Sequence, residues 1–263
     1  MYLTWLDNNS WLIEIGEQRI LLDPWLVGSL VFGNMPWLFK STHTQPSPIP
    51  ENIDLILLSQ GLEDHAHTPT LQQLDRSIPV VASPNAAKVA QKLGYSQITA
   101  LAHGESYASN NRMGDRLTIQ AVPGAPIGPL LVENGYLLTL ASGTSLYYEP
   151  HGFHSATLQA VGSVDVIITP LISLEIPLLG SVIQGSKTAL QVIEWLKPQV
   201  VVPTAAGGNV QSEGLLTSVL QEKGSIEALR ATLADRQIAT QIMTPKPGDR
   251  FQPIAVPRKV AFS

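Results

Sequence analysis

The apolar run from Ile53 to Leu58 is the feature that most constrains how this chain can fold. A short apolar run of this kind predicts a β-strand buried on both faces, and such a strand needs packed layers on both sides. A polar segment, Ser59–Leu71, begins directly at its end and contains two histidines and two acidic residues. Because ligands of layered sheet proteins gather beyond the strand ends, this segment is predicted to form part of a site.

The rest of the chain predicts short strands and a few helices. Apolar segments joined by a turn predict a hairpin over Ser10–Leu22, and a loop rich in proline and aromatics is predicted over Asp23–Asn52. Helical spacing predicts helices over Pro84–Leu93 and Ser186–Leu196. This order is typical of a mixed α/β or α+β layer protein. Gly and Pro are evenly spread and no segment has the composition of a linker, so residues 1–263 are predicted to form one domain.

The composition argues against several classes of protein. Hydrophobic residues make up 44% of the 263 residues and charged residues 14%, with a formal net charge of −5, which argues against a disordered chain and a nucleic-acid groove. Cysteine is absent, so disulfides and thiolate metal sites are excluded and a cytoplasmic location is expected. The first residues lack the pattern of a signal peptide, and no apolar run reaches the ~18 residues of a membrane span.

Five separate segments carry a resemblance to a known family. In the polar segment, the residues in register with the pattern S-H-x-H-x-D-H followed by T-L are Ser59, Asp64, His65, Thr70 and Leu71. The other four segments are Leu22-Asp23-Pro24-Trp25, Val122-Pro123-Gly124, Ser142-Gly143-Thr144 and Val201-Val202-Pro203-Thr204. The chain resembles the metallo-β-lactamase superfamily, in particular the branch of ascorbate-phosphate lactonases and phospholipases that cleave N-acyl-phosphatidylethanolamine. The resemblance implies an α+β fold, a four-layer αββα sandwich of the metallo-β-lactamase type.

The same resemblance implies that most of the usual metal ligands are replaced. Members of the family bind two metal ions through histidines and aspartates, and this chain retains Asp64 and His65 of that set. The other ligand positions fall on Gln60, Leu62, Gly143 and Ala205, with Ala125 or Pro126 at the third histidine. Because a catalytic zinc ion normally has three protein ligands and a water, hydrolase activity does not follow from the fold alone.

Other polar residues offer a rearranged site. His67 follows His65 by two positions, and Glu149 and His151 follow a short predicted strand at the edge of the same site. With Asp64 and His65 they form the candidate ligand set for one divalent ion, which would be zinc, manganese or iron. The alternative is that no metal binds and that these side chains brace their loops through hydrogen bonds. The residues expected around the pocket are Asp23, Gln60, Leu62, Gly143, Thr144, His154, Ala205, Trp25 and Trp37.

Two predicted loops are unusually apolar. Pro24–Phe39, which contains Trp25 and Trp37, and Pro170–Gly180 are both expected at the mouth of the site. Exposed apolar patches usually bind a partner, a membrane or a ligand, and aromatic side chains beside a pocket suit an acyl or isoprenoid chain. The loops therefore either cover each other, form a homodimer interface, or contact a lipophilic small molecule or a membrane surface.

Two functions follow. The first is a metal-dependent hydrolase with a reduced or relocated metal site near Asp64 and His65, with His65 or His151 as the acid–base group and a small, lipophilic substrate. The second is a non-catalytic member that binds a ligand or docks a partner through its apolar loops. The lost ligand positions favour the second function, whereas the Asp64–His65 pair and the nearby Glu149 and His151 favour the first. Nuclease activity is set aside, because it would need two metals and a basic surface.

Overall fold

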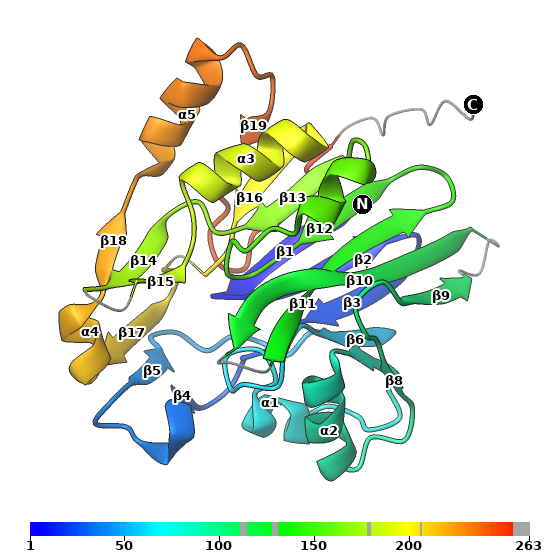
Figure 1. Ribbon diagram of the computed structural model, residues 1–263. Helices are drawn as coiled ribbons and strands as arrows, with labels where there is room; N and C mark the ends of the chain where they lie inside the picture. The colour runs from blue at the N-terminus through cyan, green and yellow to red at the C-terminus, as the bar shows by residue number, and fades with distance from the viewer. Residues whose placement is uncertain (111–114, 128–130, 178–179, 206, 255–263) are drawn as a thin grey trace.

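Two seven-stranded sheets form the centre of the molecule (Figure 1). The computed structural model describes residues 1–110, 115–127, 131–177, 180–205 and 207–254. The first sheet consists, in spatial order, of β20 (Arg250–Phe251), β1 (Tyr2–Asp7), β2 (Ser10–Ile15), β3 (Gln18–Leu22), β6 (Leu55–Leu58), β7 (Val80–Ala82) and β8 (Ile98–Ala100). The second consists of β19 (Gln241–Ile242), β16 (Val200–Pro203), β13 (Val166–Thr169), β12 (Ser145–Tyr148), β11 (Leu131–Leu140), β10 (Arg116–Ile127) and β9 (Ser106–Asn110).

Each sheet has an antiparallel part and a parallel part. Strands β3, β6, β7 and β8 run parallel in the first sheet, and strands β12, β13, β16 and β19 run parallel in the second. Tyr148 at the end of β12 donates a hydrogen bond to Asp23, the residue directly after β3. The carboxyl ends of the two parallel parts therefore meet at one edge of the molecule.

The alternation of side chains along β6 shows how the layers are held together. Leu55 and Leu57 point into the core between the two sheets, whereas Ile56 and Leu58 pack towards the helices outside the first sheet. All four side chains are buried, which confirms the predicted strand with two covered faces. Each face therefore removes apolar surface from water, and this burial is the main stabilising term of such a layered fold.

Helices cover the outer faces of both sheets, which completes the predicted αββα sandwich (Figure 1). On the first sheet the helices are α1 (Thr68–Gln73) and α2 (Pro84–Lys92). On the second they are α3 (Lys187–Leu196) and α5 (Ile226–Asp235), with the short 3₁₀ helix η2 (Ala156–Ala160) beside α3. Among the described residues, no helix combines the length and the apolar sequence needed to cross a membrane.

Two small sheets and one short helix lie together beside the sandwich (Figure 1). One sheet consists of β15 (Gly180–Ile183), β14 (Ser173–Ile176) and β18 (Gln221–Lys223). The other consists of β17 (Val210–Glu213), β5 (Lys40–His43) and β4 (Ser29–Val31), followed by the 3₁₀ helix η1 (Phe32–Asn34). Helix α4 (Leu215–Val219) comes directly after β17.

The predicted hairpin is present, with Gly16 and Glu17 at its two-residue turn. Both residues have positive φ angles, 55° and 62°, as a tight hairpin turn requires. The prediction of a plain loop over 23–52 was wrong, because β4, η1 and β5 form within it. Strand β5 pairs with β17, which lies far away in the sequence, so no local pattern could reveal the pairing.

Candidate metal centre and adjoining pocket

Four buried polar residues follow directly after strands, at the edge where the two parallel parts meet. Asp23 follows β3, Ser59 follows β6, Glu149 follows β12 and Thr204 comes after β16, and each side chain is fully buried. Buried polar groups are stable only when they are paired, so this edge needs a network of partners. The candidate centre is built on that network.

Asp23 is the acceptor for four hydrogen bonds. Its Oδ1 accepts from the Ser59 backbone N at 2.7 Å. Its Oδ2 accepts from Ser59 Oγ at 2.5 Å, from His65 Nδ1 at 2.7 Å and from Tyr148 Oη at 2.7 Å. The carboxylate thereby ties β3, the polar segment after β6 and β12 to one point, and it fixes the orientation of the His65 ring.

His65 lies between two carboxylates. Its Nδ1 contacts Asp23, and its Nε2 lies 3.0 Å from Asp64 Oδ2. Burial opposes a charge on this imidazole, but the carboxylates of Asp64 and Asp23 together raise the pKa of His65 well above its usual value. Burial likewise works against ionisation of Asp64, yet His65 and His151 lower the pKa of Asp64. The centre therefore holds strongly interacting groups of opposite charge.

Asp64, His65 and His151 converge as a metal site would. One potential ligand atom from each lies within 4.8 Å of the other two, and the rings of His65 and His151 are 5.1 Å apart between centroids. Within the described part of the chain, Asp64 Oδ1 is buried without a hydrogen-bond partner, and His65 Nε2 faces Asp64 Oδ2 at 3.0 Å as an ion-pair contact without hydrogen-bond geometry. A divalent cation would satisfy both atoms at once. Two nitrogen donors and one oxygen donor suit zinc, manganese or iron.

A second network orients His151. Its Nδ1 donates to Glu133 Oε1 at 2.7 Å, which leaves Nε2 as the ring atom able to bind a metal. Glu133 Oε1 also accepts from the Ala125 backbone N at 3.1 Å. Glu149 Oε2 accepts from the backbone N atoms of His151 at 3.2 Å and Phe153 at 2.9 Å, so it holds the loop that carries the ring. This arrangement resembles the carboxylate–histidine–metal triads in which an outer carboxylate fixes the ligand.

The carboxyl groups of Glu133 and Glu149 are close neighbours, and both are fully buried. Burial and the adjacent Glu133 raise the pKa of Glu149 well above its usual value. Burial acts in the same direction on Glu133, but His151 and His65 lower the pKa of Glu133. Of the two carboxyl groups, Glu133, next to His151, therefore carries a negative charge more readily than Glu149. Gly124 leaves room for the pair, because a Cβ there would lie 2.9 Å from Glu133 Cγ and 3.2 Å from Glu149 Oε1.

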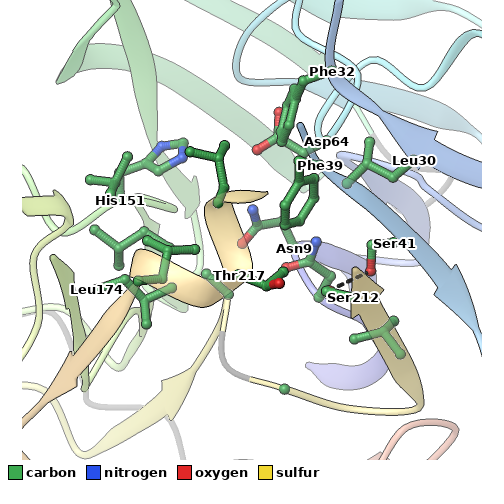
Figure 2. Close-up of a pocket in the computed structure, with 18 of the residues that line it drawn as sticks. Asn9, Leu30, Phe32, Phe39, Ser41, Asp64, His151, Leu174, Ser212 and Thr217 are labelled. Atoms are coloured by element: carbon green, nitrogen blue, oxygen red, sulfur yellow. Dashed lines mark hydrogen bonds between the residues drawn. The ribbon is translucent and has the colours of Figure 1, made fainter. Parts of the chain in front are cut away.

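A cavity of about 480 Å³ adjoins the centre, with Asp64 and His151 on its wall (Figure 2). Ala205, at the predicted position of the last histidine, also lines it. Most of the wall is apolar and includes Leu30, Phe32, Phe39, Leu174, Ile176 and Leu216. The volume is in the usual range for a small-molecule site, about 300–1,000 Å³.

Of the two remaining predicted ligands, Glu149 lies beside Glu133 and His151, whereas His67 lies away from the centre. Its Nδ1 is 3.0 Å from Thr70 Oγ1 and its Nε2 is 3.2 Å from the Ser29 carbonyl, so both ring nitrogens have partners. Two groups of potential ligand atoms converge in the described chain, Asp64–His65–His151 and Glu133–Glu149–His151, and His67 belongs to neither. Its role is to brace the loop before α1, because Thr70 also accepts from the Leu26 backbone N.

Several residues predicted around the pocket lie elsewhere. Trp25 is buried against the ring of His43, with centroids 4.2 Å apart, whereas Trp37 is 63% exposed. Gln60 is buried, Leu62 is exposed at 40%, and neither belongs to the pocket wall. His154 contacts Tyr147 Oη through Nδ1 at 3.1 Å. Of the second apolar loop, Leu174 and Ile176 line the pocket, and Leu178 and Leu179 lie outside the described residues.

The predicted register at Gly143 needs correction. Ser142 and Gly143 form the turn between β11 and β12, where Gly143 N donates to the Leu140 carbonyl, and Thr144 directly precedes β12. This turn is at the amino end of β12, whereas the site lies beyond its carboxyl end. His151, in the loop after β12, is therefore the residue of this part of the chain that reaches the centre.

Sequence reasoning missed Glu133 and Tyr148. Tyr148 gives no sequence signal, because aromatic residues are common in strands. Glu133 gives none either, because its place in a strand and its burial are known only from the structure, which puts Glu133 and Asn134, both fully buried, within β11. A buried acidic residue needs a partner, and the fold supplies His151.

The residues present fit one divalent ion. Asp64, His65 and His151 supply three ligand atoms, whereas the positions of other usual ligands carry Leu62 and Ala205, which have no donor atoms. Gln60 offers a buried amide oxygen without a partner in the described structure, and a neutral amide is a poor substitute for histidine. The donor set of Asp64, His65 and His151 therefore fits a divalent ion, and Glu133, Glu149 and His151 form a second converging group that shares His151 with it.

Comparison with known proteins agrees with the fold. A metal-dependent hydrolase from Desulforamulus reducens is 23% identical over 220 residues, which cover 77% of this chain and 83% of the relative. A cytidine monophosphate-N-acetylneuraminic acid hydroxylase from Cricetulus griseus is 35% identical over 80 residues, or 29% of this chain. That match spans 14% of the length of the hydroxylase.

Solved structures with the same fold include two hydrolases. An isothiocyanate hydrolase from Delia radicum gut bacteria superposes with a TM-score of 0.67 at 17% identity, covering 96% of this chain and 98% of the other. Igni18, a metallo hydrolase from Ignicoccus hospitalis, gives 0.65 at 15% identity, with 95% and 98% covered. The model of the beta-lactamase superfamily domain matches residues 2–205, and the chain therefore belongs to the metallo-β-lactamase superfamily.

Proposed function

We propose that this protein is a metal-dependent hydrolase that works with a single divalent ion held by Asp64, His65 and His151. The observation that carries the proposal is the convergence of three ligand atoms within 4.8 Å on the wall of a pocket large enough for a small molecule. The third ligand does not come from the sequence neighbours of the pair Asp64–His65, because Glu63 joins no group of converging ligand atoms in the described chain and Ala66 has no donor atom. The fold brings it from the loop after β12.

A bound ion of this kind supplies Lewis acidity and activates water for attack at neutral pH. The chain itself fixes the ligands. Asp23 accepts from His65 Nδ1, and Glu133 accepts from His151 Nδ1, so the Nε2 atom of each ring is left for the ion. Because both rings are held in this way, we assign His65 and His151 the role of ligands in preference to the predicted role of acid–base group.

Metal analysis and anomalous scattering test the proposal. Protein purified without chelator should carry about one ion per chain, and the anomalous signal should lie between Asp64, His65 and His151. The variant His151→Ala should lose both the bound ion and the hydrolase activity. His154→Gln is the matched control, because His154 follows the same strand but contacts Tyr147 and lies outside both ligand groups. Absence of a stoichiometric ion at these residues would refute the proposal.

A ligand-binding protein without catalysis is the second candidate function. Two positions of usual metal ligands carry Leu62 and Ala205, whose side chains cannot bind a metal ion. The lack of these ligands for a second ion favours a protein that binds without catalysing a reaction. A protein of this kind would bind the same pocket ligands with and without the metal and would not convert them. Turnover that depends on His151 and is restored by adding metal after chelation would exclude it.

A further inference from the structure

The apolar part of the pocket wall comes from three segments that are distant in the sequence. Leu30 and Phe39 lie in or near the sheet of β4 and β5, Leu174 lies on β14, and Leu216 lies on α4 (Figure 2). The Leu216 backbone N donates to the Leu38 carbonyl at 3.0 Å, which fixes α4 beside Phe39. Contacts within the chain therefore hold this part of the wall in place, as is usual for small-molecule sites, which are largely pre-formed.

The charged side chains on the pocket wall are acidic. Asp64 and Glu222 line the cavity together with His151, and the described lining includes no lysine or arginine. Proteins recognise phosphate and carboxylate groups mainly with arginine, lysine or helix N-termini. The wall therefore disfavours an anionic group outside the metal centre, and its apolar part favours a hydrocarbon chain.

We infer that the pocket takes an uncharged ester or lactone with one apolar chain. Its carbonyl group lies at Asp64 and His151, and its chain lies along Phe39, Leu174 and Leu216. This assignment rests on the proposed function, because hydrolysis requires the carbonyl to reach the metal centre. The pocket is therefore expected to bind neutral acyl compounds in preference to phosphodiesters, because the described wall has no lysine or arginine to compensate the negative charge of a phosphodiester.

Hydrolysis of such a compound needs water as its second reactant. The water oxygen bonds to the acyl carbon, and the bond between this carbon and the alkoxy oxygen breaks. One water proton goes to the alkoxy oxygen and the other to solvent. The acid formed is an anion near neutral pH, so the carboxylates of Asp64 and Glu222 favour its release.

Binding of straight-chain alcohols tests the pocket separately from catalysis. The alcohols from butanol to decanol displace a fluorescent apolar probe from the whole protein, both as purified and after treatment with chelator. Each added methylene should lower the Kd about three- to fourfold until the pocket is full, because burial of one methylene is worth about 0.8 kcal/mol. Carboxylates of the same chain length should bind more weakly to the metal-free protein.

Two matched variants test whether the ligand binds in this pocket. Val182 lines the pocket and is 47% exposed, whereas Val161 is 37% exposed and lies outside it. Val182→Asp should raise the Kd of octanol about tenfold, and Val161→Asp should leave it unchanged. Both side chains are partly exposed, so neither change should prevent folding.

The outcomes separate this inference from the proposed function. A Kd that does not depend on chain length, tighter binding of the carboxylates to metal-free protein, or equal effects of the two variants would overturn the inference. Binding that follows the chain length in a protein that carries no metal as purified and takes none up when metal is added would instead overturn the hydrolase proposal, and it would leave only the binding of an apolar chain standing. Hydrolysis of neutral esters with an increasing kcat/KM along the same series would support both.

Discussion

Replacement of Glu133 by glutamine tests how the second network controls the metal centre. Glu133 is fully buried, and its Oε1 accepts from His151 Nδ1 at 2.7 Å and from Ala125 N at 3.1 Å. A glutamine has nearly the same shape, and its amide oxygen can accept both hydrogen bonds. Glu133→Gln therefore removes the negative charge that makes the imidazole a stronger ligand, while the packing is retained.

The expected loss of metal affinity follows from the role of such outer carboxylates. Removing one typically weakens metal binding by about 10–100-fold, or ~1.4–2.8 kcal/mol. The Kd of zinc is measured by competition with a chromophoric chelator at one fixed pH. The melting temperature of the metal-free variant is measured in parallel, because it reports the structural cost alone.

Asp165→Asn is the matched control for Glu133→Gln. Asp165 is also buried, and it accepts from Ser145 N at 2.9 Å and Gln199 Nε2 at 2.8 Å at the amino ends of β12 and β16. This variant should lose stability and keep its metal affinity. An unchanged zinc Kd in Glu133→Gln, or an equal loss in both variants, would refute the reasoning that Glu133 acts through His151.

Three further predictions concern stability. Asp23→Ala leaves four donors without an acceptor and should lower the free energy of unfolding in urea by about 3–5 kcal/mol, whereas the exposed Asp54→Ala should change it by less than ~1 kcal/mol. Burial lowers the pKa of His154 to about 3, whereas a histidine in the unfolded chain has a pKa of ~6.5. Below pH ~6.5 the unfolded state therefore binds one proton more than the folded state, and the free energy of unfolding falls as the pH drops from ~6.5 towards 3. Between pH 7 and 5 the wild type should lose ~1–2 kcal/mol more than His154→Gln, and parallel pH profiles would contradict this. Gly152 has φ of 78° and an added Cβ would overlap the Gln184 carbonyl, so Gly152→Ala should cost at least ~1–3 kcal/mol in urea unfolding; an unchanged midpoint would contradict it.

Local patterns predicted those parts of the fold in which neighbours in the sequence are neighbours in space. The run ending at Leu58 indicated a strand with two covered faces, and the structure confirms it. The hairpin over Ser10–Leu22 was also predictable, because the turn and both strands lie within one short segment. The small sheet of β4, β5 and β17 was not predictable, since its two halves are far apart in the sequence.

The error at Gly143 has a physical cause. The segment Ser142-Gly143-Thr144 has the small residues of a metal-binding turn, but a hairpin turn needs the same residues for its backbone. Composition cannot tell at which end of β12 a turn lies. The parallel pairing of β12 with β13 decides this, because it places the carboxyl end of β12, and with it His151, at the centre.

The sequence by itself determined the strand with two covered faces that ends at Leu58 and the pair Asp64–His65, because periodicity and covalent adjacency need no distant partner. The tertiary structure decided the third ligand and what orients it. His151 reaches His65, and Glu133 reaches His151, only after strands from both sheets have been placed. Long-range strand pairing sets these distances, and a local stretch of sequence does not contain that information.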